Sequence, residues 1–410
     1  MYTTKKPIVE IYDRLFNRIE FTDDFISLIW TDRYNDVGEF ELVLPITENM
    51  TNIYKNGYFV KRNDRENVCY IESIEKKYES SSGPQIKITG KDSINIANQR
   101  IIYNSHQYNK EASEIVREIF QDNLSYPSDT LREIHQIHGL FMTDEAESAL
   151  LPKIEIETNH DPLLDKILEI LKQFNVGLRS YLYSGPTAAL DKVIVFEAFS
   201  GTDRSKVQKS NPRIIFSPKF DNLKSTTFLR NIAEFKNMAY SEGKYEIAVK
   251  TSPETYEIME VSMFGEAGYG KGLGRFEEYV DSTSVDKNVN GVELTNDEFR
   301  QVLKQKGIDD LVEKSEIYLL DSEVYANNYE YYKDYFIGDI VSIDDEQGIN
   351  GDARIAEVIE NFDSNGYSVA ITFDYVRLSL DNIVTESDTY NSAVKDDDDL
   401  LTESYEVLLT

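Results

Sequence analysis

The spacing of hydrophobic residues changes twice along this chain, and that change limits the folds it can adopt. Residues 1–100 contain short β-rich runs, and in residues 38–45 the side chains of Phe40, Leu42 and Leu44 alternate onto one face. Such alternation is typical of a strand with one buried face. The same β character returns from residue 214 to about residue 375. Both ends of the chain are therefore predicted to be built from strands.

Between these regions the hydrophobic residues follow the period of a helix. In residues 109–124 they recur three and four positions apart, at Ala112, Ile115, Val116, Ile119 and Phe120, which indicates an amphipathic helix. A second helix is predicted to start at Asp161-Pro162, because proline suits the first turn. Further on, Thr295 and Glu298 have the spacing of a capping box, which predicts a helix over residues 295–314.

These patterns predict a mainly β chain with an α+β insert. At 410 residues the chain exceeds what one hydrophobic core usually serves. We expect two related β-barrel domains that flank a small α+β domain: a first β-barrel in 1–100, the α+β insert in 101–213, and a second β-barrel in 214–377 with a helical or loop insertion at about 255–330. Residues 378–410 are expected to form an acidic C-terminal tail, since residues 396–399 are all aspartate.

Two segments of the predicted barrels resemble each other. Each is a series of strand, polar turn, strand, polar turn and strand, at residues 57–64, 71–75 and 86–89 and again at 338–345, 355–360 and 369–372. The shared skeleton is Gly-x-x-Val, an Ile-Glu pair and a closing Ile-Thr. Three-strand meanders are common, so coincidence stays open as an alternative. If the echo is real, three chains would present six similar modules around an axis, because closed cyclic symmetry is the usual rule for homo-oligomers.

The charge balance excludes most nucleic-acid-binding roles. Asp and Glu number 74 against 43 Lys and Arg, which gives a formal net charge of −31. Such a surface repels phosphate backbones and anionic membranes, so we expect no specific nucleic-acid binding. Two interpretations stay open: the charge serves solubility, or it lines a channel along which DNA passes without sticking.

The cysteine count and the apolar runs bound the environment of the chain. The single cysteine, Cys69, excludes an intrachain disulfide framework and any multi-cysteine metal site, and it suits a reducing cytosol. No apolar run approaches the roughly 18 residues that a membrane helix needs. The first residues lead into strand-like sequence instead of the apolar core of a signal peptide. We therefore expect no membrane-spanning segment.

No set of residues satisfies the requirements of a catalytic, cofactor or metal site, so we predict none of the three and a protein that is not an enzyme. The four histidines, His106, His135, His138 and His160, all lie in the predicted α+β insert. His135-x-x-His138 has metal-compatible spacing if helical but lacks a clear third ligand, and solvated surface histidines are the alternative. Cys69 lies in mid-strand, far in sequence from every histidine, and is interpreted as a buried residue.

Two loops were candidates for phosphate or calcium binding. Residues 265–272 nearly spell a phosphate-binding loop, but Gly272 stands where a hydroxyl residue would hold Mg²⁺, so a mobile loop is predicted. Residues 344–352 are rich in carboxylates but lack the EF-hand spacing, and a turn between strands is predicted.

Four stretches, taken in order, carry a family resemblance. They are Trp30-x-x-x-Tyr34-x-x-x-Gly38-x-Phe40-Glu41-Leu42-x-Leu44-Pro45, then Gly90-Lys91-Asp92 with Arg100-Ile101-Ile102, then residues 231–243, and last Tyr335-x-x-Gly338-Asp339-Ile340-Val341 with Arg354-Ile355 and Ile371-Thr372-Phe373. Together they resemble the siphophage tail-hub family, which includes tail-associated lysins and prophage endopeptidase-like tail proteins. The resemblance covers roughly residues 5–377.

The resemblance implies a baseplate-hub-like homotrimer in which two barrels per chain form a pseudo-hexameric ring below the tail tube. The implied partners are a distal tail protein or tail tube ring, a tape measure protein, and a tail fibre or receptor-binding protein. The implied location is the virion tail tip, after assembly in the bacterial host cytoplasm, with a channel that opens for DNA ejection. Residues 291–410 leave no room for a long lysin or receptor-binding extension, so peptidoglycan cleavage is not carried over.

Two other functions stay open from the sequence. A cell-wall hydrolase would need a cleft of converging titratable groups, expected around residues 101–213. A host-receptor or glycan-binding tail-tip protein would use exposed aromatic residues, which the 27 Tyr could supply.

Overall fold

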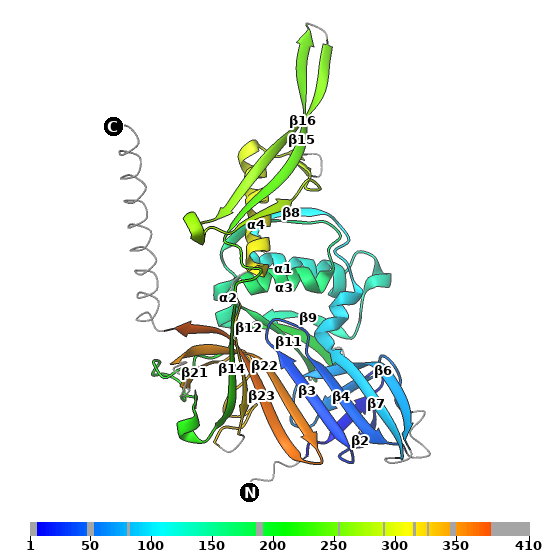
Figure 1. Cartoon of the computed structure of the whole chain (residues 1–410). Coiled ribbons are helices and arrows are strands. Elements are labelled where there is room, and N and C mark those ends of the chain that lie inside the picture. Colours follow the sequence, from blue (N-terminus) through cyan, green and yellow to red (C-terminus); the bar gives the residue numbers. More distant parts are fainter. Residues whose placement is uncertain are drawn as a thin grey trace, which may run out of the picture.

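The computed structural model of the chain describes residues 6–46, 53–79, 83–185, 192–252, 255–289, 292–314, 317–325, 328–344 and 350–378. Figure 1 shows a large curved sheet at one end, a helical layer in the middle, and a projecting hairpin with a helix at the other end. The acidic tail predicted for 378–410 lies outside the described residues except for residue 378. That part of the division into domains stays a prediction.

The large sheet contains strands from both ends of the chain. Its order is β14-β20-β23-β22-β3-β4-β7-β6-β5-β1-β2, with β21 beside β22 and β13 beside β21. The bounds in the N-terminal half are β1 Val9–Tyr12, β2 Arg18–Thr22, β3 Ser27–Arg33, β4 Glu39–Pro45, β5 Phe59–Arg62, β6 Val68–Glu79 and β7 Gly83–Asp92. In the C-terminal half they are β13 Ile215–Phe216, β14 Leu223–Asn231, β20 Ile317–Val324, β21 Ile340–Asp344, β22 Asn350–Asp363 and β23 Gly366–Leu378.

We call β1–β7 the first β module and β13, β14 and β20–β23 the second β module. The sheet curls around a separate hydrophobic core in each module, and the alternation predicted for Phe40, Leu42 and Leu44 places all three in the first core. Among the described strands neither module closes on itself as a barrel, because the outer edge of β3 pairs with β22 instead. The sequence predicted two related β-barrel domains, and the structure has two related β modules that are open and fused into one sheet.

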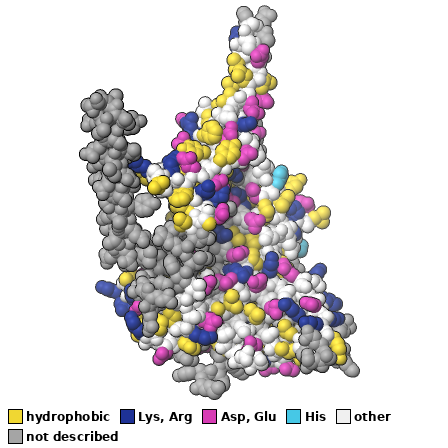
Figure 2. All heavy atoms as spheres, viewed as in Figure 1, with side chains coloured by type: hydrophobic (Ala, Val, Ile, Leu, Met, Phe, Trp, Pro, Cys, Tyr) yellow, Lys and Arg dark blue, Asp and Glu magenta, His cyan; other side chains and the backbone are white. Residues whose placement is uncertain are grey.

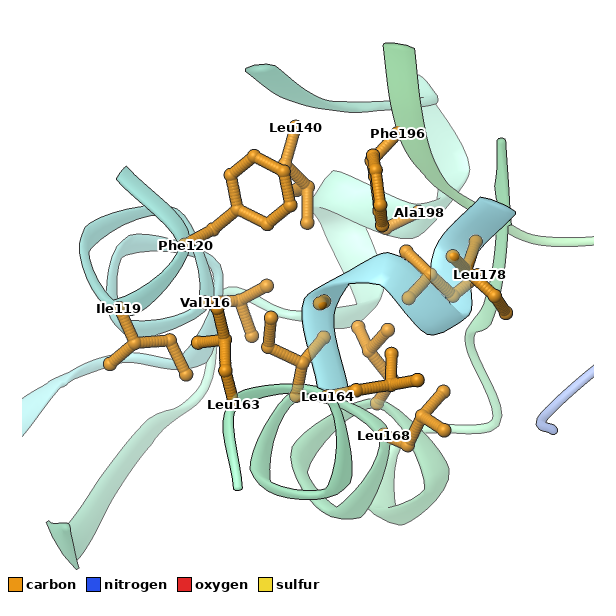
Figure 3. Close-up of a cluster of buried hydrophobic side chains, with 14 of the residues drawn as sticks. Val116, Ile119, Phe120, Leu140, Leu163, Leu164, Leu168, Leu178, Phe196 and Ala198 are labelled. Atoms are coloured by element: carbon orange, nitrogen blue, oxygen red, sulfur yellow. The ribbon is translucent and has the colours of Figure 1, made fainter. Parts of the chain in front are cut away.

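The middle layer confirms the mainly β chain with an α+β part. Helices α1 (Ala112–Phe120) and α3 (Leu163–Gln173) pack with a three-stranded sheet. Figure 3 shows their shared cluster of apolar side chains, in which the ring of Phe120 lies beside that of Phe196. The other elements are α2 Asp144–Ala149, β8 His106–Glu111, β9 Ile137–Met142, β10 Lys153–Thr158, β11 Gly177–Tyr183 and β12 Val193–Phe199. Both helices begin and end close to their predicted bounds. None of the described helices is long and apolar enough to cross a membrane.

The projecting part is inserted into the second β module. It contains a long hairpin, β15 (Met238–Ser252) and β16 (Thr255–Gly268), then β17 (Glu277–Asp281), the short pair β18 (Asn288–Val289) and β19 (Val292–Glu293), and helix α4 (Asn296–Glu313). The predicted capping box at Thr295 and Glu298 starts α4. In Figure 2 apolar side chains are mixed with acidic ones along this hairpin.

The prediction of a mobile loop at residues 265–272 is wrong for its first half. Gly265 and Gly268 lie in strand β16, and a Cβ atom on Gly265 would clash with the backbone of Lys304 in α4. A Cβ on Gly243, in the neighbouring strand, would lie 2.7 Å from the Leu303 side chain. These glycines let the helix lie directly on the hairpin, so their role is close packing.

Candidate functional site

The two β modules repeat each other residue by residue in their strand pairing. In the first module Val60 lies opposite Cys69, and Ile74 lies opposite Ile88. In the second module Val341 lies opposite Ala353, and Val358 lies opposite Ile371. Strands β5, β6 and β7 therefore correspond to β21, β22 and β23 with the alignment that the sequence echo predicted.

The correspondence extends to the irregular positions. The N–H of Gly57 donates to the carbonyl of Ile71 at 2.7 Å, and that of Gly338 donates to the carbonyl of Ile355 at 2.8 Å. Both glycines have positive φ angles, 80° and 86°, a conformation that only glycine adopts without strain. A β-bulge directly follows each isoleucine, between Ile71 and Ser73 and between Ile355 and Glu357. A shared bulge fixes a shared bend in the sheet, so the echo is a true structural repeat.

The repeat also includes the strands on the far side of each meander. In the first module β7 pairs with β4, which pairs with β3. In the second module β23 pairs with β20, which pairs with β14, in the same antiparallel sense. Strand β3 therefore corresponds to β14.

The two modules meet at a junction formed by β3 and β22, which lie side by side as the blue and orange strands of Figure 1. The pairing is antiparallel and runs from Glu357 opposite Arg33 to Phe362 opposite Leu28. The ring of Phe362, from the second module, lies in the hydrophobic core of the first. We call this pairing the intrachain junction.

A buried ionic cluster spans the intrachain junction. Glu360 of the second module is 2% exposed, and its Oε2 accepts hydrogen bonds from Arg62 at 2.7 Å and from Arg65 at 2.8 Å. Its other oxygen accepts one from the Tyr367 hydroxyl at 2.8 Å. Arg62 is 1% exposed and also contacts Asp64 at 2.7 Å. Because a buried charge without a partner is strongly unfavourable, this cluster holds the two modules in one register.

A second polar contact lies beside the first. The Tyr331 hydroxyl of the second module donates to Asp32 of the first at 2.8 Å, and Trp30 Nε1 donates to the other carboxylate oxygen at 3.1 Å. Burial raises the pKa of Asp32, although the positive charge of Arg65 opposes that shift. Burial also raises the pKa of Tyr331 well above its ordinary value, which keeps the hydroxyl protonated as a donor.

Tyr34 joins the two β modules to the middle layer. Its hydroxyl donates to the carbonyl of Asn175 at 2.7 Å, beyond the end of α3. Its ring fills the space that a Cβ on Gly177 or on Gly338 would need. Tyr34 of the first sequence motif and Gly338 of the last thus meet at the joint of three parts.

A small cavity lies next to this joint and is the best candidate for a ligand site. Asp32, Asp92, Arg179 and Ser180 are among its lining residues. Burial raises the pKa of Asp92 to about 7, and the Ser180 hydroxyl donates to Asp92 at 2.7 Å. Asp92 is therefore a carboxyl group beside the serine that is half ionised near neutral pH. Ser180 is 1% exposed, however, and its hydroxyl also lies 2.6 Å from that of Ser93, so the pair belongs to a buried polar network, and no histidine is among the residues that line the cavity. Within the described ranges no group of three or more His, Cys, Asp or Glu is placed to hold a metal ion.

The residues considered from sequence are spread over the molecule. His135 lies in a turn before β9, so the pair with His138 is not helical as the metal hypothesis required, and its Nδ1 contacts Glu133 at 2.9 Å. Cys69 is buried in the first core, as predicted, at the position that Ala353 has in the second. Of residues 344–352, those from 345 to 349 lie outside the described residues.

Sequence reasoning missed the ionic cluster. Arg62 and Asp64 were interpreted only as part of the strand segment 57–64, Glu360 as the end of the segment 355–360, and Arg65 was given no role. The available signal was Glu360 itself, because it stands between Val358 and Phe362 on the face of β22 that the alternation marks as buried.

Comparisons with known proteins agree with this architecture. The family model described as Siphovirus ReqiPepy6 Gp37-like protein matches residues 8–373. No curated protein sequence matches the chain significantly. The chain is similar to the prophage MuSo2 43 kDa tail protein from Shewanella oneidensis, with a TM-score of 0.51 and 14% identity over 89% of this chain and 98% of that one. It is also similar to the tail protein from Neisseria meningitidis MC58, with a TM-score of 0.54 and 10% identity over 90% of this chain and 97% of that one. At such identities the likeness establishes the fold.

Proposed function

The chain belongs to the Siphovirus ReqiPepy6 Gp37-like family, and from that premise we propose that it is a structural subunit of a phage tail tip, a trimeric hub that continues the hexameric tail tube. In this role the protein is not an enzyme. It lies at the virion tail tip after assembly in the host cytoplasm and forms a channel that opens for DNA ejection.

The register-matched repeat of the two β modules is the observation that carries this proposal. One chain presents two equivalent modules in tandem, so a threefold assembly presents six equivalent positions to a sixfold ring. Closed cyclic symmetry is the usual arrangement of homo-oligomers. The two tail proteins with the same fold support the placement in a tail.

The proposed partners are those that the family resemblance implies. One face of the trimer meets a distal tail protein or the tail tube ring, the lumen accommodates the end of the tape measure protein, and the opposite face receives a tail fibre or receptor-binding protein. The net charge of −31 supports a lumen that repels the DNA backbone.

Measurement of the mass in solution, together with imaging of tails, tests the proposal. Light scattering is expected to give a mass of about three times 47.3 kDa, and a labelled chain is expected at the tip of isolated tails. A strict monomer at high concentration, combined with absence of the label from tail tips, would refute the hub role.

The non-enzymatic part of the proposal has its own test. The purified chain is expected to produce no clearing in a zymogram with bacterial cell walls. Clearing that disappears with an Asp92→Asn variant would overturn the structural role in favour of a hydrolase centred on the cavity.

A further inference from the structure

Among the described strands of the large sheet, β2, β13, β14 and the later part of β6 each have a neighbouring strand on one side. Two of these edges, on β14 and β6, have counterparts at the intrachain junction, and β14 pairs with β20 on its other side. Strand β5 covers only the first part of β6, from Val68 to Tyr70. The repeat gives both edges a known counterpart, since β14 corresponds to β3 and β6 corresponds to β22.

In the intrachain junction, those counterparts pair with each other. We propose that residues 73–78 of β6 pair antiparallel with residues 226–231 of β14 in a second copy of this chain, and that this pairing is the contact that joins neighbouring subunits. The proposal rests on the trimer proposed above and specifies the surface and register by which the trimer forms. Intrachain and interchain junctions would then alternate around the ring.

The repeat fixes the register of the interchain pair. Strand β22 corresponds to β6, with Val358 at the position of Ile74. Strand β3, which pairs with β4, corresponds to β14, which pairs with β20, and in this correspondence Trp30 is equivalent to Phe228. Since Glu360 lies opposite Trp30, Lys76 should lie opposite Phe228 of the second copy. One step further along, Lys77 should lie opposite Thr227.

The exposure of Tyr78 supports this pairing. Tyr78 occupies in β6 the position that Phe362 occupies in β22, and Phe362 is 5% exposed because it enters the core of the neighbouring module. Tyr78 is 75% exposed in the single chain. An aromatic side chain left in water at the equivalent position is explained if it enters the second β module of a neighbouring copy.

The charges at the two junctions are complementary in the opposite sense. At the intrachain junction an acid, Glu360, meets Arg62 at the end of β5 and Arg65 beyond it. On β6 the equivalent position holds a base, Lys76. In β21, which corresponds to β5, the counterpart of Arg62 is Ile343, and the next residue is an acid, Asp344, which contacts Lys219 at 3.6 Å. The proposed junction would therefore bring Lys76 near an acid of the second copy, and this favours the alternating order over pairing between like edges.

Disulfide trapping tests both the partner and the register. Opposite residues in an antiparallel pair have Cα atoms about 4.5–5.5 Å apart, within the range that a disulfide spans. The full chain would carry Cys69→Ala, then Lys77→Cys with Thr227→Cys, both on the solvent side of the sheet. The matched control, Lys77→Cys with Thr226→Cys, is displaced by one residue, which turns the second thiol to the other face.

The expected result is a covalent trimer on non-reducing gels, with roughly ten times more product from the in-register pair than from the control. Equal cross-linking of the two, or none from the in-register pair, overturns the proposed strand pairing. Light scattering of the unmodified chain distinguishes failure of the strand pairing from failure of the hub proposal. A trimer without the in-register cross-link refutes this pairing and leaves the hub proposal standing. A monomer that gives no cross-link refutes both.

A substitution at Tyr78 provides a second measurement. Tyr78→Asp is expected to raise the dissociation constant of the trimer roughly tenfold or more, because a buried aromatic ring is replaced by a charge. The control is Tyr126→Asp, at a tyrosine that is 63% exposed in the turn beyond α1. Equal effects of the two substitutions would contradict burial of Tyr78 between subunits.

Discussion

The ionic cluster predicts a large and local effect of replacing Glu360 by glutamine. The substitution keeps the shape of the side chain but removes the negative charge from two guanidinium groups, of which Arg62 is 1% and Arg65 6% exposed. Breaking one side of a buried ion pair usually costs about 3–5 kcal/mol. Asp64 remains as a partner of both arginines, but its side chain is 42% exposed, so it offsets only part of that cost. The lower end of the range, about 3 kcal/mol, is expected.

Hydrogen exchange followed by mass spectrometry measures this loss of stability at the junction itself. A single unfolding free energy is poorly defined for a chain with several cores, whereas peptides covering β3 and β22 report the opening of the junction itself. A loss of about 3 kcal/mol corresponds to exchange roughly a hundredfold faster in those peptides. The control is Glu41→Gln, which breaks a half-exposed pair with Lys87 at 2.7 Å on the same sheet and should change exchange by less than about fivefold. Unchanged exchange in Glu360→Gln would show that the arginines do not depend on this carboxylate and that the ionic cluster does not hold the two modules in register.

Three further predictions concern other parts of the molecule. Burial beside Glu169, near Lys166, raises the pKa of Asp309 to about 7, so the packing of α4 on α3 is fully stabilised below the ordinary carboxyl pKa and weakens as pH rises through 7. In thermal scans of both proteins, Asp309→Asn should therefore raise the unfolding midpoint at pH 8 but not at pH 3.5. Gly265→Ala should detach α4 from the hairpin, because the added methyl group clashes with the Lys304 backbone. Far-UV circular dichroism and limited proteolysis in residues 296–313 should detect the loss, while the control Gly274→Ala, whose added methyl group meets nothing within 4 Å, should have no effect. Cys69 should resist thiol reagents in the folded protein, since burial raises the pKa of its thiol well above the ordinary value, and Cys69→Ala should cost no more than about 1–2 kcal/mol because Ala353 fills the equivalent position; rapid labelling of the native chain would contradict the burial.

The sequence predicted the elements that depend on local pattern. The stripe at Ile115, Val116 and Ile119 specified α1, and the box at Thr295 and Glu298 specified α4, because both signals lie within a few residues. The internal echo was also visible in sequence, since equivalent positions in a repeat share the same burial. Gly265 was misinterpreted as part of a mobile loop, because its close packing appears only when α4 lies on the hairpin. The pairing of β3 with β22 was not predictable, because it joins residues more than three hundred positions apart and neither strand has a sequence pattern that identifies its neighbour.

The intrachain junction and the proposed interchain junction differ in when each must form. The intrachain junction joins strands of one polypeptide, which meet at high effective concentration, and it can therefore contain a fully buried ionic cluster whose charges lose their water as the chain folds. The interchain edge must stay soluble until a second copy arrives. Glu75, Lys76 and Lys77 place consecutive charges on β6, and charged residues on an exposed strand edge oppose pairing with unsuitable strands. An edge that can be buried only opposite a complementary partner selects the correct neighbour. Replacing Lys76 and Lys77 by threonine should therefore produce off-register aggregates at concentrations where the natural chain is expected to give the proposed trimer. Sedimentation velocity of the two proteins distinguishes these outcomes, and a threonine variant that remains a single trimeric species would show that the lysines have no part in that selection.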